Sequence, residues 1–155
     1  MKNAFINNED IHTSTAARVF NIDINQVNEE QRRNAKIVNF GIIYGVSAFG
    51  LSNQTNLTRG ESKEIIDNYF KSYPKLKEYM SNQISFAREK GYVETILKRK
   101  RYLPDINSRN AMIRSSAERN AINTPVQGSA ADIIKLAMIK INGKIKNSND
   151  CKMLL

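Results

Sequence analysis

Residues 31–50 read QRRNAKIVNFGIIYGVSAFG and predict a helix with two different faces. Asn28 can cap its N-terminus, and Gln31 stands at the third helical position, where a capping box needs an acceptor. Gly45 offers a C-terminal stop. The apolar residues that share one side of the helix, and through which it should pack, are Ala35, Val38 and Ile42.

A second stripe follows every fourth residue of the same helix: Arg32, Lys36, Phe40 and Tyr44. At about 1.5 Å per residue the stripe is roughly 18 Å long. Its cations lie in the N-terminal half, where the helix dipole also favours anions, and its rings lie in the C-terminal half. A polyphosphate followed by a sugar and a base would match this order. The alternative is a basic amphipathic helix whose Phe and Tyr are core residues.

The composition fits one domain or a piece of a larger one, with 155 residues of which 41% are apolar. The sequence has no run of 18 apolar residues that would predict a membrane span, and its N-terminus lacks the apolar core of a signal peptide. The single cysteine, Cys151, excludes an internal disulfide and fits a reducing compartment.

The net charge of +9 is unevenly distributed. Residues 1–94 hold 12 basic and 11 acidic side chains, whereas residues 95–155 hold 12 basic and 4 acidic side chains. A solvated basic face is one explanation. The asymmetry favours the other, a polyanionic partner such as nucleic acid.

Local signals predict further elements on both sides of the central helix. Capping residues and apolar spacing indicate helices over 11–20, 58–72 and 74–91, the last two forming a helical hairpin. Alternation over 92–96 and 101–103 predicts a small β-hairpin whose tip, 98–101, is KRKR. A solvated tip and a phosphate-binding tip are equally compatible with these four cations.

The C-terminal part predicts two more helices. Ser108 can cap a helix over 109–122, and Asn-Thr-Pro at 123–125 should interrupt it, because a residue before proline avoids the helical region. The last helix, from about 126 or 128 to 146, is apolar over more than one face and should be largely buried. Residues 151–155, CKMLL, resemble the start of a buried strand.

Phosphoryl chemistry normally needs carboxylates that hold metal ions. The acidic residues stand at helix starts, on helix surfaces or alone, so the residues themselves predict no metal site. The residues therefore predict binding of a phosphorylated ligand and of nucleic acid, without the metal site that a reaction would need.

The segment RRNAKIVNFGIIYG resembles motif B of family A DNA polymerases of the DNA polymerase I type. The resemblance extends through EDIHTSTAARVF, YFKSYPKLKEYM, GYVET, RYLPDI and AERNAINTPVQGSAADIIK, and so covers essentially the whole chain. It implies a mostly α fold, a fingers-type helical subdomain with one small β-hairpin. All 155 residues would form a single fragment of a polymerase domain, with fingers over about 1–107 and palm-side helices over about 108–155.

The resemblance also implies that the stripe binds an incoming deoxynucleoside triphosphate. Arg32 and Lys36 would contact the phosphates, and Lys36 would protonate the departing pyrophosphate. Phe40 would pack on the sugar and Tyr44 would stack near the base, so that Lys36, Arg32 and Tyr44 would be the catalytic residues of this part. His12, which by itself suggests only a surface residue, would also reach the phosphates.

The DNA template–primer is the second implied partner. Arg119, Asn123 and Gln127 match residues that line its minor groove, where the base acceptors are alike for every correct pair. Ser47 and Phe49 match the template side. The remainder of the polymerase chain would be the third partner, and no membrane is implied. The resemblance also implies that the protein is located in the bacterial cytoplasm and is associated with the nucleoid.

The chain departs from the family pattern in what it lacks. The two aspartate motifs that hold Mg²⁺ in the parent enzyme would lie just before Met1 and just after Leu155, so we expect no metal bound by the fragment and no catalysis by it alone. Lys98 stands where the family commonly has a hairpin glycine. The competing hypothesis is a non-enzymatic, basic helical nucleic-acid-binding module.

Overall fold

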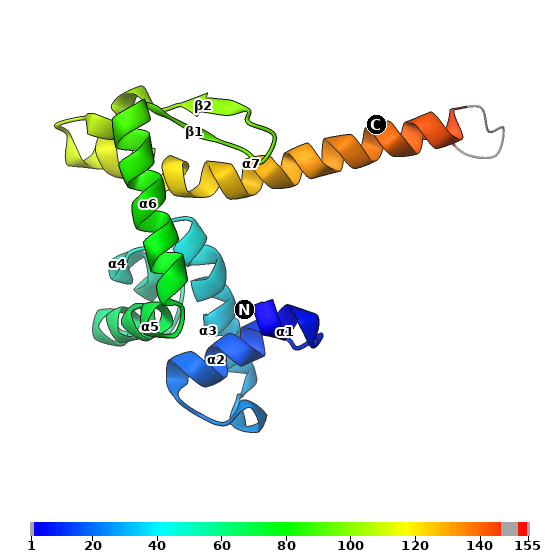
Figure 1. Ribbon diagram of the computed structural model, residues 1–155. Coiled ribbons are helices and arrows are strands. Elements are labelled where there is room, and N and C mark those ends of the chain that lie inside the picture. Colours follow the sequence, from blue (N-terminus) through cyan, green and yellow to red (C-terminus); the bar gives the residue numbers. More distant parts are fainter. Residues whose placement is uncertain (1, 147–151, 155) are drawn as a thin grey trace. The chain divides into compact units, whose positions relative to one another are not determined.

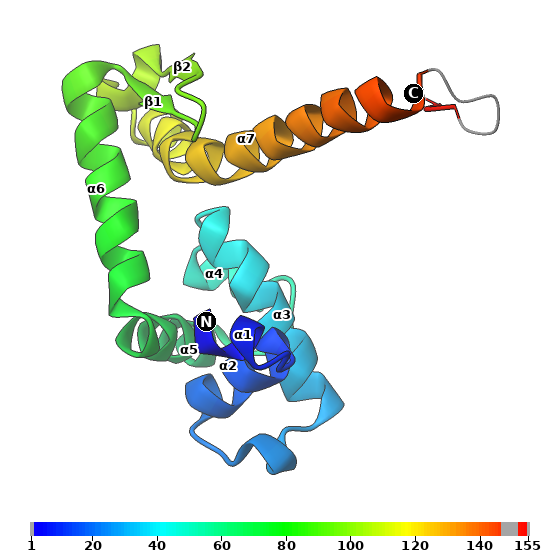
Figure 2. The ribbon, with the colours of Figure 1, turned by 45° about the vertical axis from the view of Figure 1, so that its right-hand side comes forward.

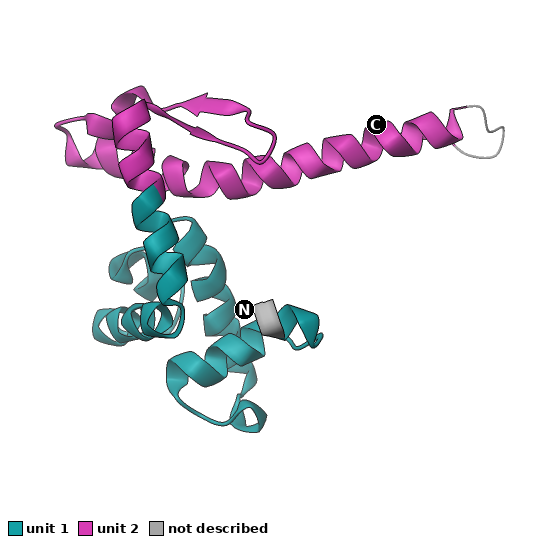
Figure 3. Cartoon of the chain, viewed as in Figure 1, with its two compact units in different colours: residues 1–82 teal, residues 83–155 magenta. Residues whose placement is uncertain are grey.

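The computed structural model describes residues 2–146 and 152–154, with side chains from Ala4 onward. The described chain is mostly α, with one two-stranded sheet, which confirms the expected fold class (Figure 1). The chain forms two compact units, residues 1–82 and 83–155 (Figure 3). The expected boundary between fingers and palm-side helices, near residue 107, is a functional division and stays a prediction.

The first unit is helical. Its elements are α1 (Lys2–Ile6), α2 (Ile11–Phe20), the 3₁₀ helix η1 (Ile24–Gln26), α3 (Glu29–Ile43), α4 (Ala48–Ser52), α5 (Arg59–Ser72) and the first half of α6 (Pro74–Lys90). Helices α2 and α3 lie against each other, and α5 packs on α2 and α4. The core that these helices share consists of Val19, Val38, Ile42, Leu51, Ile65, Tyr69 and Tyr73.

The helix starts are set by the capping residues expected from the sequence. Asn28 and Gln31 form both bonds of a capping box at α3, and Thr58 and Glu61 do the same at α5. Asp10 caps α2 by accepting hydrogen bonds from the backbone N–H groups of His12 and Thr13, each at 2.9 Å.

Helix α3 ends in a Schellman turn around Gly45, which has a φ of 69°. Val46 N–H donates to the Gly41 carbonyl at 2.8 Å, and Gly45 N–H donates to the Ile42 carbonyl at 3.0 Å. The Val46 side chain occupies the space over Gly41, where an added Cβ would lie 2.8 Å from Val46 Cγ1. Both glycines are therefore required by the chain's own turn.

Helices α5 and α6 do not form the expected helical hairpin. Only Tyr73 separates Ser72 from Pro74, and one residue is too short a connection to reverse the chain. Helix α6 consequently leaves in a new direction instead of running back along α5 (Figure 1 and Figure 2). Its first turns still pack Leu76 and Met80 against the core of the first unit.

The second unit contains the expected β-hairpin. Strand β1 (Tyr92–Glu94) pairs antiparallel with β2 (Lys100–Tyr102), and Tyr92 lies opposite Tyr102. Lys98 in the loop has a φ of 63°, the left-handed conformation that glycine adopts without steric cost. The position thus keeps the backbone shape of a glycine turn with a lysine in it.

Helix α7 (Ala111–Ile145) follows the 3₁₀ helix η2 (Pro104–Asn107) and overturns three expectations. It is continuous through Pro125, so the predicted interruption at 123–125 is wrong. Proline removes one backbone donor, but the hydrogen bonds of the flanking turns keep a long helix together. Its N-cap is Asn110, which accepts from the backbone N–H of Met112 at 2.9 Å, whereas Ser108 ends η2.

The third expectation, burial of the last helical segment, is also wrong. Residues beyond Asp132 on α7 are not buried in this chain, and Ile139 is 68% exposed. The second unit packs instead around the hairpin, η2 and the first half of α7. Its core residues are Ala87, Val93, Leu103, Ile106, Ala117 and Ala121.

The predicted strand over 151–155 falls partly outside the described residues, and residues 152–154 have no regular structure. In the part of the chain that the structure describes, no helix has the length and apolarity needed to cross a membrane.

Candidate functional site

The four residues of the stripe lie on α3 and its C-cap, and the structure exposes both of its rings. Phe40 is 52% and Tyr44 is 49% exposed, while Val38 and Ile42 on the packing side of the same helix are buried. The alternative that both rings belong to the core is therefore wrong. Lys36 and Arg32 are also exposed, about one and two turns closer to the N-terminus than Phe40, respectively. The helix presents cations and then rings in the expected order.

Asp10 holds one of these cations. Its Oδ2 accepts hydrogen bonds from Arg32 Nε at 3.2 Å and from Arg32 Nη2 at 2.5 Å. The Arg32 bonds, followed by the backbone N–H of Thr13, lower the pKa of Asp10 from 3.8 to about 2. Asp10 therefore both caps α2 and fixes the guanidinium of Arg32 at the crossing of α2 and α3.

His12 is brought to the stripe by the same crossing. Its ring centroid lies 5.8 Å from that of Phe40. Burial, together with the positive charges of Arg32 and Lys36, lowers the pKa of His12, although Asp10 acts in the opposite direction. The imidazole is therefore neutral at pH 7 and can donate only one ring N–H. The expected nucleotide-binding residues thus form one surface on the first unit.

Ser47 and Phe49, the expected template-side residues, lie directly after the Schellman turn. Ser47 caps α4 by accepting from the backbone N–H of Gly50 at 3.1 Å, so its hydroxyl has a structural role. Phe49 is exposed. Its ring is available to a partner.

The remaining expected DNA-binding residues belong to the second unit, four residues apart on α7. Arg119 and Gln127 are exposed, and Asn123 is half-buried with its Oδ1 atom without a hydrogen-bond partner. Asn123 and Gln127 line a groove between α7 and the hairpin; its other lining residues are Thr95, Arg99, Lys100, Arg101, Thr124, Gly128 and Ala131. The groove combines amide groups with three cations.

The four cations of the hairpin tip all have partners within the second unit. Lys98 pairs with Glu94 at 3.4 Å, and Lys100 Nζ lies 4.2 Å from the centroid of the Tyr92 ring. Arg101 donates to Thr124 Oγ1 at 3.0 Å. These contacts favour a structural role for much of the tip's charge.

Arg99, the fourth cation, fastens the hairpin to α7. It pairs with Asp132 at 2.7 Å, and Asp132 is only 5% exposed. Arg99 also donates to the Gly128 carbonyl at 3.3 Å, and the Ile96 N–H donates to Ser129 Oγ at 2.8 Å. The small residues at the start of the QGSAAD segment, 127–132, let the hairpin approach the helix backbone.

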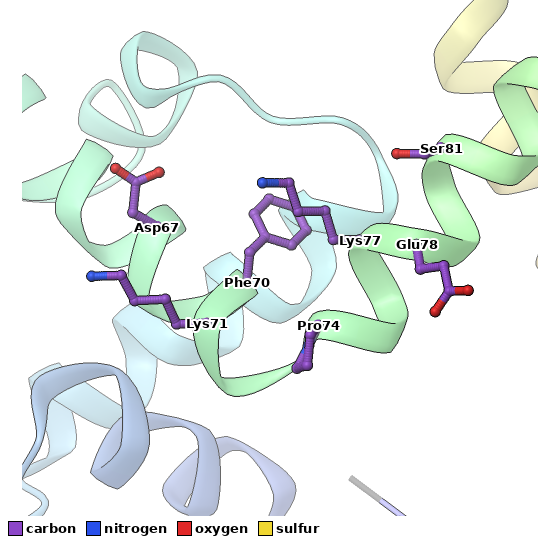
Figure 4. Close-up of a pocket in the computed structure, with 7 residues that line it drawn as sticks. All are labelled: Asp67, Phe70, Lys71, Pro74, Lys77, Glu78 and Ser81. Carbon is purple, nitrogen blue, oxygen red and sulfur yellow. The ribbon is translucent and has the colours of Figure 1, made fainter.

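A pocket where α5 meets α6 contains none of the expected site residues (Figure 4). It is lined by Asp67, Phe70, Lys71, Pro74, Lys77, Glu78 and Ser81. Two carboxylates and two ammonium groups share it, and Lys77 Nζ lies over the Phe70 ring at 6.0 Å. This balance of charge does not match an anionic ligand.

Metal ligation has no candidate in the described chain. There, no three His, Cys, Asp or Glu side chains are close enough together to hold an ion. The described residues therefore offer no such donor set, and no step through a metal is derived from them.

Two residues that support the site were not identified from the sequence. Asn39 and Thr15 are buried between α2 and α3 and hydrogen-bond to each other. The available signal was a polar Asn39 among the apolar positions of α3, because a buried amide needs a partner. Which partner it has depends on residues 24 to 27 positions away and could not be derived.

The sequence profile described as DNA polymerase family A matches residues 1–155. DNA polymerase I of Streptococcus pneumoniae is 55% identical over 154 residues, and that of Caldicellulosiruptor bescii is 54% identical over 146 residues. These alignments cover 98% and 94% of this chain but only 18% and 17% of the relatives.

A solved structure gives the same result. The POL domain of Pol1 from M. smegmatis, in complex with DNA primer-template and dNTP, superposes with a TM-score of 0.86 at 42% identity. The match covers 94% of this chain and 26% of that one. The match over the full sequence, the identity and the shared fold lead to one conclusion: the chain belongs to DNA polymerase family A.

Proposed function

We propose that this chain is the part of a DNA-directed DNA polymerase that binds the incoming deoxynucleoside triphosphate and the template–primer. The observation that carries the proposal is the exposed stripe on α3, two cations followed by two rings, with His12 packed beside Phe40. The M. smegmatis structure with DNA primer-template and dNTP supports both partners.

In this proposal each stripe residue meets a different part of the nucleotide. Arg32 and Lys36 bind the phosphates at the N-terminal half of α3, where the helix dipole adds to their charge. Lys36 donates a proton to the departing pyrophosphate. Phe40 packs on the sugar and Tyr44 on the base, since both rings are exposed. His12 donates its ring N–H to a phosphate oxygen.

The template–primer contacts are assigned to both units. Arg119, Asn123 and Gln127 face the minor groove, where an amide donor meets an acceptor on every correct base pair. For Asn123 the donor would be the Nδ2 group, because its Oδ1 can only accept. Ser47 and Phe49 would act at the template side.

Calorimetric titration with dATP tests the nucleotide site. Arg32→Ala and Lys36→Ala should each weaken dATP binding about tenfold or more, because each loses a hydrogen bond to a charged group. Arg33→Ala is the matched control: it removes another exposed cation from the neighbouring position of α3 and should leave affinity within about twofold. An equal loss in all three variants would contradict a specific site.

The second candidate, a non-enzymatic nucleic-acid-binding module, is favoured by the excess of 12 basic over 4 acidic residues in 95–155. Such a module would bind DNA with a steep dependence on salt, and the Arg32→Ala and Lys36→Ala variants would lose DNA and dATP affinity together. A nucleotide site predicts loss of dATP affinity with most of the DNA affinity retained.

We infer that the 155 residues alone do not catalyse nucleotide addition. The Mg²⁺ ions that such a reaction uses would be held by the remainder of the polymerase chain, which would also complete both binding sites. Primer extension by the pure fragment with Mg²⁺ and all four nucleotides is the test. Extension of the primer would place metal ligands within this chain. We expect the parent enzyme to act in the bacterial cytoplasm on nucleoid DNA.

A further inference from the structure

Asn39 is a buried amide at the contact between α2 and α3, 9% exposed, directly beside the exposed Phe40. Its Nδ2 lies 3.0 Å from His12 Nδ1 and 3.2 Å from Thr15 Oγ1. Thr15 is fully buried. The three side chains form a hydrogen-bonded group behind the surface to which nucleotide binding is assigned above.

The direction of these hydrogen bonds follows from counting protons. A threonine hydroxyl has one proton, and Thr15 Oγ1 makes its shortest contact, 2.7 Å, with the Ile11 carbonyl, which can only accept. Thr15 Oγ1 must therefore accept from Asn39, so the amide nitrogen faces it. Asn39 Oδ1 also lies 3.3 Å from Thr15 Oγ1, but two acceptors cannot bond, so Nδ2 is the amide atom that bonds to the hydroxyl and, in the orientation of the structure, lies next to His12.

The second proton of Asn39 Nδ2 then points to His12. A neutral imidazole carries one proton, and a Nδ1 atom that accepts a hydrogen bond leaves that proton on Nε2. Burial and the charges of Arg32 and Lys36 keep the ring neutral at pH 7 against the opposing charge of Asp10. These three are the charged groups that act on the ring.

We propose that Asn39 is a positioning residue that fixes His12 in the Nε2–H tautomer, so that a neutral donor rather than an acceptor faces a bound anion. The Ile11 carbonyl takes the hydroxyl proton of Thr15, and Thr15 thereby orients Asn39. Asn39 in turn leaves the ring proton of His12 on Nε2. A neutral donor binds a phosphate oxygen without adding a third positive charge beside Arg32 and Lys36. The phosphate as partner rests on the proposed function; the tautomer does not.

The tautomer can be measured directly, because His12 is the only histidine in the chain. In the ¹⁵N-labelled protein above the pKa of His12, two-bond ¹H–¹⁵N correlations should show a protonated Nε2 and an unprotonated Nδ1. The decisive variant is Asn39→Asp. Its carboxylate can only accept, so the proton should move to Nδ1 and the pKa of His12 should rise.

Two further variants keep the experiment interpretable. Asn34→Asp places the same carboxylate at another buried position of α3 and should leave the proton on Nε2. Asn39→Ala removes the donor without adding charge. In this variant the ¹⁵N chemical shifts of the two His12 ring nitrogens should move toward the averaged values of free histidine. If the proton stays on Nε2 in Asn39→Asp, or lies on Nδ1 in the unaltered chain, the proposal is wrong.

Titration with dATP separates this proposal from the proposed function. Asn39→Ala should weaken dATP binding about tenfold through the loss of an oriented donor to a charged group, and His12→Ala should do the same. The double variant should be no weaker than His12→Ala, because Asn39 acts through His12. A changed tautomer with unchanged dATP binding would leave the role of Asn39 standing and would contradict the phosphate role of His12.

Discussion

Phe40 and Ile42 are two positions apart on α3 but have opposite surroundings. Phe40→Ala should change the free energy of unfolding by less than about 1 kcal/mol, because half of the ring is already exposed. Ile42→Ala should cost about 2–5 kcal/mol, since it leaves a cavity in the core. Urea denaturation followed by circular dichroism measures both. A large loss of stability in Phe40→Ala would show that the ring is a core residue after all.

The Asp10–Arg32 pair should make stability depend on acid pH. Because folding lowers the pKa of Asp10 from 3.8 to about 2, its carboxylate stabilises the fold above pH 4, and this contribution falls away between about pH 4 and pH 2. Asp10→Asn keeps the helix cap and removes the charge. Both side chains of the pair are more than 40% exposed, so we expect a difference of no more than about 1 kcal/mol at pH 7.

Thermal melts of the unaltered chain and Asp10→Asn at several pH values between 7 and 3 provide the measurement. The difference between the two should shrink as the pH falls. Repeating the comparison in an Arg32→Gln background is the control, where the pH-dependent difference should become smaller, because only the backbone N–H groups of Thr13 and His12 then lower the pKa of Asp10. A difference that grows toward low pH would show that Asp10 acts through another partner.

The residues of the site divide into those that could be predicted and those that could not. The helical period places Arg32, Lys36, Phe40 and Tyr44 on one stripe, because that relation is local. Asn39 bonding to Thr15 and His12 depends on how α2 crosses α3, and no spacing in the sequence encodes that crossing. The roles of the stripe residues came from the family resemblance and stay predictions.

At the scale of elements, the docking of the hairpin on α7 depends on Gly128. A Cβ added there would lie 2.6 Å from Thr95 Cγ2, and Thr95 cannot turn away without losing the bond that its Oγ1 accepts from the Arg99 N–H. We expect Gly128→Ala to destabilise the second unit by about 1–2 kcal/mol, because the clash exceeds the gain in helix propensity.

Gly143→Ala on the same helix is the matched control. A Cβ there meets nothing within 4 Å, so alanine should stabilise the helix by about 0.5–1 kcal/mol. Differential scanning calorimetry of both variants gives the comparison. Equal stabilisation by the two substitutions would mean that the hairpin is not held against Gly128.

Three helix starts could be predicted from local capping signals. A cap is a bond between residues two or three positions apart, as at Asp10, Asn28 and Thr58, and such a bond is visible in the sequence. Pro125 shows the limit of local rules. Its preceding residue is disfavoured in a helix, but the contacts that residues 117–132 make with the hairpin and η2 outweigh that preference.

For the whole molecule, the cores of the two units predict where the backbone is most protected. Helix α7 packs in the second unit up to Asp132, and its described residues beyond that point are not buried. An unpacked helical segment of about a dozen residues is only marginally stable in water. Hydrogen–deuterium exchange should therefore be slow over 114–132 and fast over 133–145. Uniform protection along α7 would indicate that the second half is covered in solution.

The class of the whole molecule could be predicted because helical periods and the hairpin alternation are local and repeated along the chain. The division at residue 82 could not, because it depends on which core each half of α6 joins. The expected burial of the last helical segment failed for a similar reason. A run of apolar residues indicates that a helix surface is to be buried. It does not indicate which part of a protein buries that surface.

The turn after α3 has a mechanical consequence. Two short backbone bonds and the Val46 side chain fix the chain on both sides of Tyr44, so the corner between α3 and α4 is a stiff joint. A rotation of α3 that displaces the Tyr44 ring must carry Ser47 and Phe49 with it. Tyr44, which is assigned to the incoming nucleotide, would then move together with the two residues that are assigned to the template.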